Sequence, residues 1–104
     1  IDKSIEMLEL AYQKKKDDPY ILDSVGWAYF LIGNYLKAEL FLNQAIILMP
    51  NDPIVNDHYG DILWRLNRKI EAKYYWQSVL SKDSTTAEMI KNINSKILVG
   101  LKKT

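Results

Sequence analysis

Apolar residues recur along the chain at helical spacing, in two stretches that share one plan. Each stretch carries one apolar row, a break, and a second row, and this pattern predicts two helices joined by a short turn. The break falls at Gly33-Asn34 in the first stretch and near Asn67-Arg68 in the second. In the first stretch the two rows are Leu22, Val25, Gly26, Tyr29 and Tyr35, Ala38, Leu42, Ala45, Ile46. In the second stretch they are Asn56, Tyr59, Gly60, Leu63 and Ala72, Trp76, Val79, Leu80.

Three junctions give the two stretches a common period. Asp18-Pro19, Asp52-Pro53 and Thr86-Ala87 follow one another at 34-residue steps. Asp and Thr are good N-caps, and Pro suits the first helical position, so each junction predicts a helix start. The chain therefore contains two complete units, residues 19–52 and 53–86.

Small residues recur at one place in each unit. Gly26 is matched by Gly60, and Ala38 by Ala72, at the same register positions. A glycine facing an alanine lets two antiparallel helices approach more closely than bulkier side chains permit. We expect both units to be tightly packed helical pairs.

The flanks follow the same register. Residues 1–18 match the second half of a unit, and residues 87–101 match the opening half of another. Asn94 takes the place of the close-packing glycine in the last segment, which is typical of a capping helix. We therefore expect one all-α domain over residues 1–104, with five or six helices.

The residues resemble the tetratricopeptide repeat, a 34-residue motif with Leu-Gly, Tyr, Ala, an aromatic and Pro at fixed places. The first unit supplies Leu22, Val25-Gly26, Tyr29, Ala38, Leu42, Ala45 and Pro50; the second departs from the motif at Asn56, Val79 and Ser84. The amino-acid sequences of residues 22–29 and 56–65 are similar to those of the last repeats in certain bacterial members of this family. The resemblance implies a right-handed α-solenoid that binds proteins without catalysis, with the first helix of each pair lining the concave side.

Removing the packed rows from the first helices leaves a set of aromatic, acidic and basic side chains as the candidate peptide-binding surface. Aromatic residues anchor partners, and carboxylates favour Lys or Arg on the partner, which predicts a basic and apolar peptide or protein segment. The alternative is that the aromatics pack against neighbouring helices while the acids are solvated or act locally. The candidates are Asp23, Trp27, Phe30, Asp57, His58, Asp61, Trp64 and Arg65.

One function of related repeats is disfavoured by the charges. Some co-chaperones hold a peptide's terminal carboxylate with Lys, Asn and Arg on the concave wall. Here the corresponding rows carry Asp23 and Asp57, with Trp27 and Asp61 nearby. Acids at these positions would repel a carboxylate, so we expect no carboxylate clamp in this segment.

The composition excludes several other classes. The chain is 48% hydrophobic with a net charge of +1, which favours a folded protein and disfavours nucleic acid as a partner. The basic runs 14–16 and 102–103 complement the ends of helices. The longest apolar stretch, residues 45–49, is too short to span a membrane.

Catalytic and metal chemistry have few candidate residues. There is no cysteine, and His58 is the single histidine. Asp57 is adjacent to His58 and points elsewhere on a helix, whereas Asp61, three residues on, could approach it. No third ligand is evident and no glycine-rich phosphate loop occurs, so we expect no metal, no cofactor and no enzyme activity in these residues.

The last segment and the chain ends leave several alternatives open. Leu98, Val99 and Leu101 widen the final apolar face, either for packing as a cap or for a dimer or docking contact. We favour a monomer, with structural self-association and a docking arm of a larger enzyme as alternatives. The chain begins at Ile1 without an initiator Met, so we expect part of a longer protein and leave its compartment open.

Overall fold

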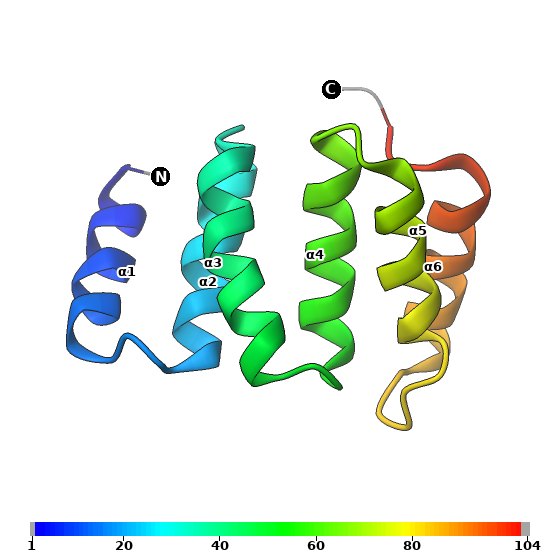
Figure 1. Cartoon of the computed structure of the whole chain (residues 1–104), viewed down its shortest axis with the longest axis horizontal. Helices are drawn as coiled ribbons and strands as arrows, with labels where there is room; N and C mark the ends of the chain where they lie inside the picture. Colours follow the sequence, from blue (N-terminus) through cyan, green and yellow to red (C-terminus); the bar gives the residue numbers. More distant parts are fainter. Residues whose placement is uncertain (1, 103–104) are drawn as a thin grey trace.

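The computed structural model describes residues 2–102, which fold into six helices without a strand. The helices stand side by side in chain order, in a body of 37 × 31 × 21 Å (Figure 1). They are α1 (Asp2–Lys14), α2 (Pro19–Leu31), α3 (Tyr35–Leu48), α4 (Pro53–Arg65), α5 (Lys69–Val79) and α6 (Ala87–Val99). The expected all-α fold with five or six helices is confirmed, with six.

The predicted helix starts are confirmed in their local chemistry. Asp18 accepts hydrogen bonds from the backbone N–H groups of the first turn of α2, and Asp52 does the same for α4. Thr86 caps α6 by accepting from the backbone N–H of Met89. Each cap satisfies a donor that the helix itself leaves unpaired, so the 34-residue spacing of the caps sets the spacing of α2, α4 and α6.

The turns within each helix pair end at residues with left-handed backbone. Gly33 has φ 85° and Asn67 has φ 63°, the two residue types that adopt this conformation most readily. α6 ends at Val99, two residues before the predicted end at 101, and Gly100 follows it with φ 72°. The final turn therefore leaves the helix axis at Gly100.

The core is built where a first helix meets its second helix. A Cβ on Gly26 would lie 2.1 Å from the Leu42 side chain and 3.2 Å from the Ala38 carbonyl oxygen. A Cβ on Gly60 would lie 2.4 Å from the indole of Trp76. Leu42 and Trp76 are both fully buried, which confirms the close approach that the glycines predict.

Tyrosine hydroxyls join α2 to α1 and α4 to α3. Tyr29 of α2 donates to Glu9 of α1, and Tyr59 of α4 donates to Glu39 of α3 over 2.9 Å. The hydrogen bond to Glu9, with burial, raises the pKa of Tyr29 to about 12. Burial, with the hydrogen bond to Glu39, raises the pKa of Tyr59. Both phenols are held in their neutral form across the physiological range.

Two further expectations meet the structure here. None of the helices of residues 2–102 is long and apolar enough to cross a membrane. The helix boundaries agree with units 19–52 and 53–86, while the assignment of the flanks to partial repeats remains a prediction. Lys102 is exposed beyond α6, and Lys103 of the same run lies outside the described residues.

Candidate peptide-binding face

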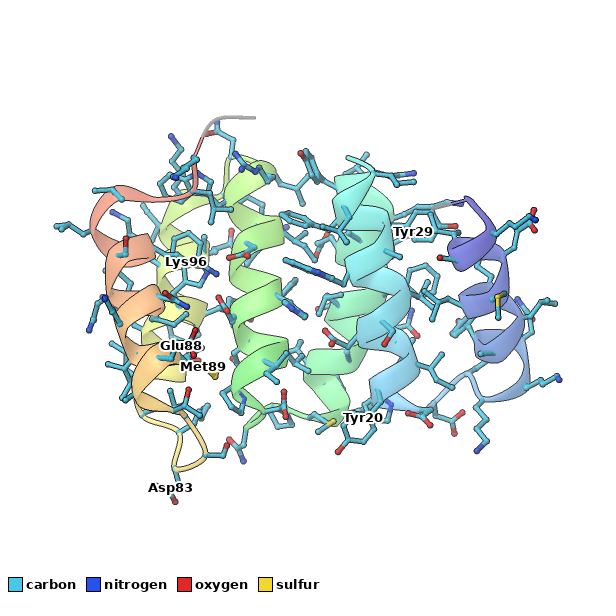
Figure 2. All side chains as sticks on the ribbon, turned by 180° about the vertical axis from the view of Figure 1, so that it is seen from behind. Tyr20, Tyr29, Asp83, Glu88, Met89 and Lys96 are labelled. Carbon is cyan, nitrogen blue, oxygen red and sulfur yellow. The ribbon has the colours of Figure 1, made fainter. Side chains whose placement is uncertain are left out.

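The predicted site residues lie on the first helices of the pairs. Figure 2 looks onto this side of the molecule, with α2 in front of α3 and α6 in front of α5. We name it the first-helix face, and it carries Tyr20, Asp23, Trp27, Ile54, Asp57, His58 and Lys96. Two junctions divide it, one between α2 and α4 and one between α4 and α6.

The α2–α4 junction is organised around an aromatic stack. Trp27 lies between Phe30, at 4.6 Å between ring centroids, and His58, at 3.9 Å. The rings are nearly parallel, tilted by 17° and 15°. Phe30 packs against the buried core, whereas Trp27 is half-buried and stands outside that cluster. The stack thus extends from the core onto the surface.

Asp23 fixes the histidine end of this stack. Its Oδ1 lies 2.9 Å from Nδ1 of His58, and the two side chains are 17% and 20% exposed. The hydrogen bond and the ring contact together set the orientation of the imidazole. The spacing would allow Asp61 to approach His58, but His58 turns across the junction to Asp23 while Asp61 faces α6.

Exposed apolar side chains lie in the first turns of the same two helices. Tyr20, in the first turn of α2, is 70% exposed, and Ile54, in the equivalent turn of α4, is 51% exposed. Figure 2 shows Tyr20 at the start of its helix. Ser24 between them and the stack is also exposed. The junction therefore offers an apolar and aromatic surface bordered by the carboxylates of Asp23 and Asp57.

The α4–α6 junction is closed by a lysine. Nζ of Lys96 lies 2.7 Å from Oδ1 of Asp57 and 3.0 Å from Oδ1 of Asp61. In Figure 2 its side chain points from α6 toward α4. Burial opposes the charge of Lys96, but Asp61 and Asp57 outweigh it and raise the pKa of the ammonium. Asp57 and Asp61 thus bind a cation of their own chain.

Asp61 belongs to the interior rather than to an open face. It is 7% exposed and accepts a hydrogen bond of 3.0 Å from the indole N–H of Trp76. Burial raises the pKa of Asp61, and the Lys96 ammonium opposes that rise. The expectation that Asp61 lines an exposed groove is therefore not met. Its carboxylate connects α4, α5 and α6.

Trp64 and Arg65 lie beneath the final turn of the chain. A Cβ on Gly100 would come within 2.1 Å of the Trp64 ring, so the bare backbone of that glycine covers the indole. Nζ of Lys69 lies 4.8 Å from the centroid of the same ring. Arg65 donates to the carbonyl oxygen of Lys102 over 2.5 Å. Both predicted residues are engaged by their own chain.

The sequence interpretation missed Lys96. Its register position is shared by Ala28 and Ile62, both in first helices, and Ile62 is fully buried. A lysine in a row that is otherwise small or apolar, with two aspartates on the preceding first helix, was the available signal. Among residues 2–102, no three acidic or histidine side chains come close enough together to hold a metal ion.

Comparison with known proteins supports the fold and the repeat. No protein-family model matches the chain. A TPR repeat-containing protein of Pseudomonas aeruginosa is 39% identical over 56 residues, which is 54% of this chain and 9% of that protein. Protein bimA of Emericella nidulans is 22% identical over 85 residues, 82% of this chain and 10% of that one. The chain thus spans about a tenth of the length of these relatives.

A solved structure matches the fold over most of the chain. The first TPR of Spaghetti (RPAP3), bound to an HSP90 peptide of sequence SRMEEVD, superposes with a TM-score of 0.78. The match covers 90% of this chain and 75% of that one, at 20% identity. Together with the 34-residue caps and the glycine rows, these similarities show that the chain has the fold of tetratricopeptide repeats.

Proposed function

We propose that the chain is a non-catalytic binding module that recognises a peptide or protein segment over the α2–α4 junction of the first-helix face. The observation that carries the proposal is the Phe30–Trp27–His58 stack, whose Trp27 stands outside the core. A surface aromatic that is already held in place loses little conformational entropy when a partner covers it. The exposed rings and aliphatic groups beside it supply contact area.

The charges of the junction define the partner's chemistry. Asp23 and Asp57 lie at equivalent positions of α2 and α4, and the next position in this row is Lys91 of α6. This row is therefore acidic on α2 and α4 and basic on α6. Because carboxylates favour guanidinium and ammonium groups, we infer a segment that combines apolar residues with Lys or Arg.

The eight predicted residues differ in what they can offer a partner. Asp23, Trp27, Phe30 and His58 form the surface, and Asp57 borders it while holding Lys96. In this proposal Asp61, Trp64 and Arg65 support the fold instead of contacting the partner, because α6 and the turn that follows it engage them. The neighbour of known structure also binds a peptide, which supports the general mode. Its peptide carries three acids, so the specificity proposed here differs.

Selection from displayed random peptides tests the proposal. Peptides enriched on the native chain are synthesised and titrated by fluorescence anisotropy against two matched pairs of variants. Tyr20→Ala removes an exposed ring from the first-helix face, and Tyr74→Ala removes a similarly exposed ring, 66% against 70%, from α5. Asp23→Lys and Asp83→Lys make the same charge change on the face and in the α5–α6 loop.

The expected result is enrichment of peptides with Lys or Arg beside apolar residues. Affinity should fall about tenfold or more with Tyr20→Ala and with Asp23→Lys, and stay unchanged in the two controls. Equal affinity for all four variants would place binding elsewhere on the chain. Enrichment of acidic peptides would contradict the inferred specificity.

A second candidate function, self-association, is favoured by the far side of α6. Leu98 is 82% exposed and Val99 is 71% exposed, at the end of a helix whose one fully buried residue is Ile93. Sedimentation across concentration distinguishes this candidate. A dimer that Leu98→Ser converts to a monomer would support it, and a monomer at all concentrations would contradict it.

A further inference from the structure

One end of the molecule gathers the turns within the helix pairs. Residues 31–37 comprise the α2–α3 turn and the adjoining helix ends, and residues 65–71 comprise the α4–α5 turn and its adjoining helix ends, at the upper end in Figure 1. We name these two segments the turn edge. The turns between pairs, residues 15–18, 49–52 and 80–86, lie at the opposite end.

The two ends differ in charge although the whole chain is near neutral. The turn edge has four cations, Lys37, Arg65, Arg68 and Lys69, against one acid, Glu71. The opposite turns have three lysines against four aspartates. Glu71 and Glu39 both pair with Arg68, so Lys37, Lys69 and Arg65 supply the remaining positive charge at this end.

The cations of the turn edge are interspersed with exposed aliphatic side chains. Leu36 and Ile70 occupy equivalent positions in the first turns of α3 and α5 and are 71% and 88% exposed. Leu31 and Ile32 are exposed at the end of the preceding helix. A shallow groove between the two turns is lined by Ile32, Tyr35, Leu36 and Leu66, among others. Apolar tips therefore project from both turns.

The lysines stand on aromatic rings. Nζ of Lys37 lies 5.0 Å from the ring centroid of Tyr29, and Nζ of Lys69 lies 4.8 Å from that of Trp64. Each ammonium is thereby held against a ring of the preceding first helix. Lysine beside exposed Leu and Ile, with aromatic rings beneath, is the chemistry that suits the boundary between lipid headgroups and acyl chains.

We propose that the turn edge binds the surface of a membrane that contains anionic phospholipids. Lys37 and Lys69 meet the headgroups, and Leu36, Ile70 and their neighbours insert their tips between them. Charge complementarity selects this occupant: exposed apolar residues also occur at the opposite end, for example Leu48, but without the excess of cations. A nucleic acid would meet the cations and leave the aliphatic tips without a partner. The contact is peripheral and lies away from the first-helix face.

Vesicle flotation with the 104-residue chain tests the proposal. The probes are vesicles of phosphatidylcholine alone and vesicles that also contain phosphatidylglycerol. The charge variant Lys37→Glu, Lys69→Glu is compared with Lys15→Glu, Lys16→Glu, which makes the same change at the opposite end. The apolar variant Leu36→Ser, Ile70→Ser is compared with Met7→Ser, Leu10→Ser, whose side chains are 71% and 65% exposed on α1. Circular dichroism confirms that each variant is folded.

The native chain should float with the anionic vesicles and much less with the neutral ones. The partition coefficient should fall about thirtyfold in the charge variant and about tenfold in the apolar variant, with both controls near the native value. Failure of the native chain to float, or equal losses in the controls, would overturn the proposal. So would an unchanged apolar variant combined with displacement by duplex DNA, which would assign the edge to nucleic acid.

Discussion

The two junctions of the first-helix face place similar residues under different constraints. At the α2–α4 junction, Asp23 meets a histidine whose ring stacks on half-buried Trp27. At the α4–α6 junction, the buried Asp61 meets Lys96 and the N–H of Trp76. The first pair joins two helices, whereas the second joins three helices through the buried carboxylate of Asp61. The same residue type therefore holds three helices together at one junction and, in the proposed function, contributes to recognition at the other.

The tryptophans provide the largest contrast between the two junctions. Trp76→Leu removes a fully buried ring and leaves Asp61 without its indole donor, so it should lower the free energy of unfolding by about 3 kcal/mol. Trp27→Leu should cost less than about 1 kcal/mol, because Trp27 stands outside the core. Urea denaturation measures both. Equal losses would mean that the stack at the open junction is part of the structural core.

The glycines test how rigid each helix pair is. Gly60→Ala forces a methyl group against the indole of Trp76, which Asp61 holds in place, and should cost about 2 kcal/mol. Gly26→Ala meets the end of the more flexible Leu42 side chain and should cost about 1 kcal/mol. Thermal unfolding of both variants checks the order. The reverse order would show that Leu42 and the Ala38 backbone are the less yielding neighbours.

The contribution of Tyr29, which lies outside both junctions, can be tested by raising the pH. The pKa of Tyr29 is raised to about 12 in the fold, above the value of about 10 for an unfolded tyrosine. Its contribution is therefore fully present below pH 10 and is lost as the pH rises toward 12, by about 1 kcal/mol at pH 11. Stability measured from pH 9 to 11.5 should fall less steeply for Tyr29→Phe than for the native chain. Parallel profiles would contradict the raised pKa.

Peptide charge gives the smallest expected effect. The acidic peptide SRMEEVD, which the structural neighbour binds, should bind this chain weakly because Asp23 and Asp57 face the binding surface. Asp23→Asn removes one repulsion and should improve its affinity about twofold, the equivalent of roughly 0.5 kcal/mol. Isothermal titration compares the two proteins. Tight binding of this peptide by the native chain would refute the acidic character of the site.

Much of the fold could be predicted because its determinants are local. An Asp or Thr cap, a Pro at the first helical position and a glycine row each act within a few residues, and they recur every 34. The caps at Asp18, Asp52 and Thr86 are found where the spacing predicts them. The buried state of Trp76 also follows from its row.

Which candidate residues are available to a partner, and which are engaged by their own chain, could not be predicted in the same way. The contact of Lys96 with Asp57 spans 39 residues and depends on how α6 rotates against α4. Trp64 is covered because the chain turns away from the axis of α6 at Gly100. Register assigns a residue to the first-helix face, but the side chain across the junction decides whether that residue is available.

The central claim is that Asp61 supports the fold while Asp23 supports recognition. Urea unfolding of Asp61→Ala and Asp23→Ala, side by side, tests it most directly. Removal of Asp61 leaves a partly buried ammonium and an indole donor with a missing partner and should cost about 3 kcal/mol, whereas removal of Asp23 should cost about 0.5 kcal/mol. A loss of stability with Asp23→Ala as large as that with Asp61→Ala would contradict the account.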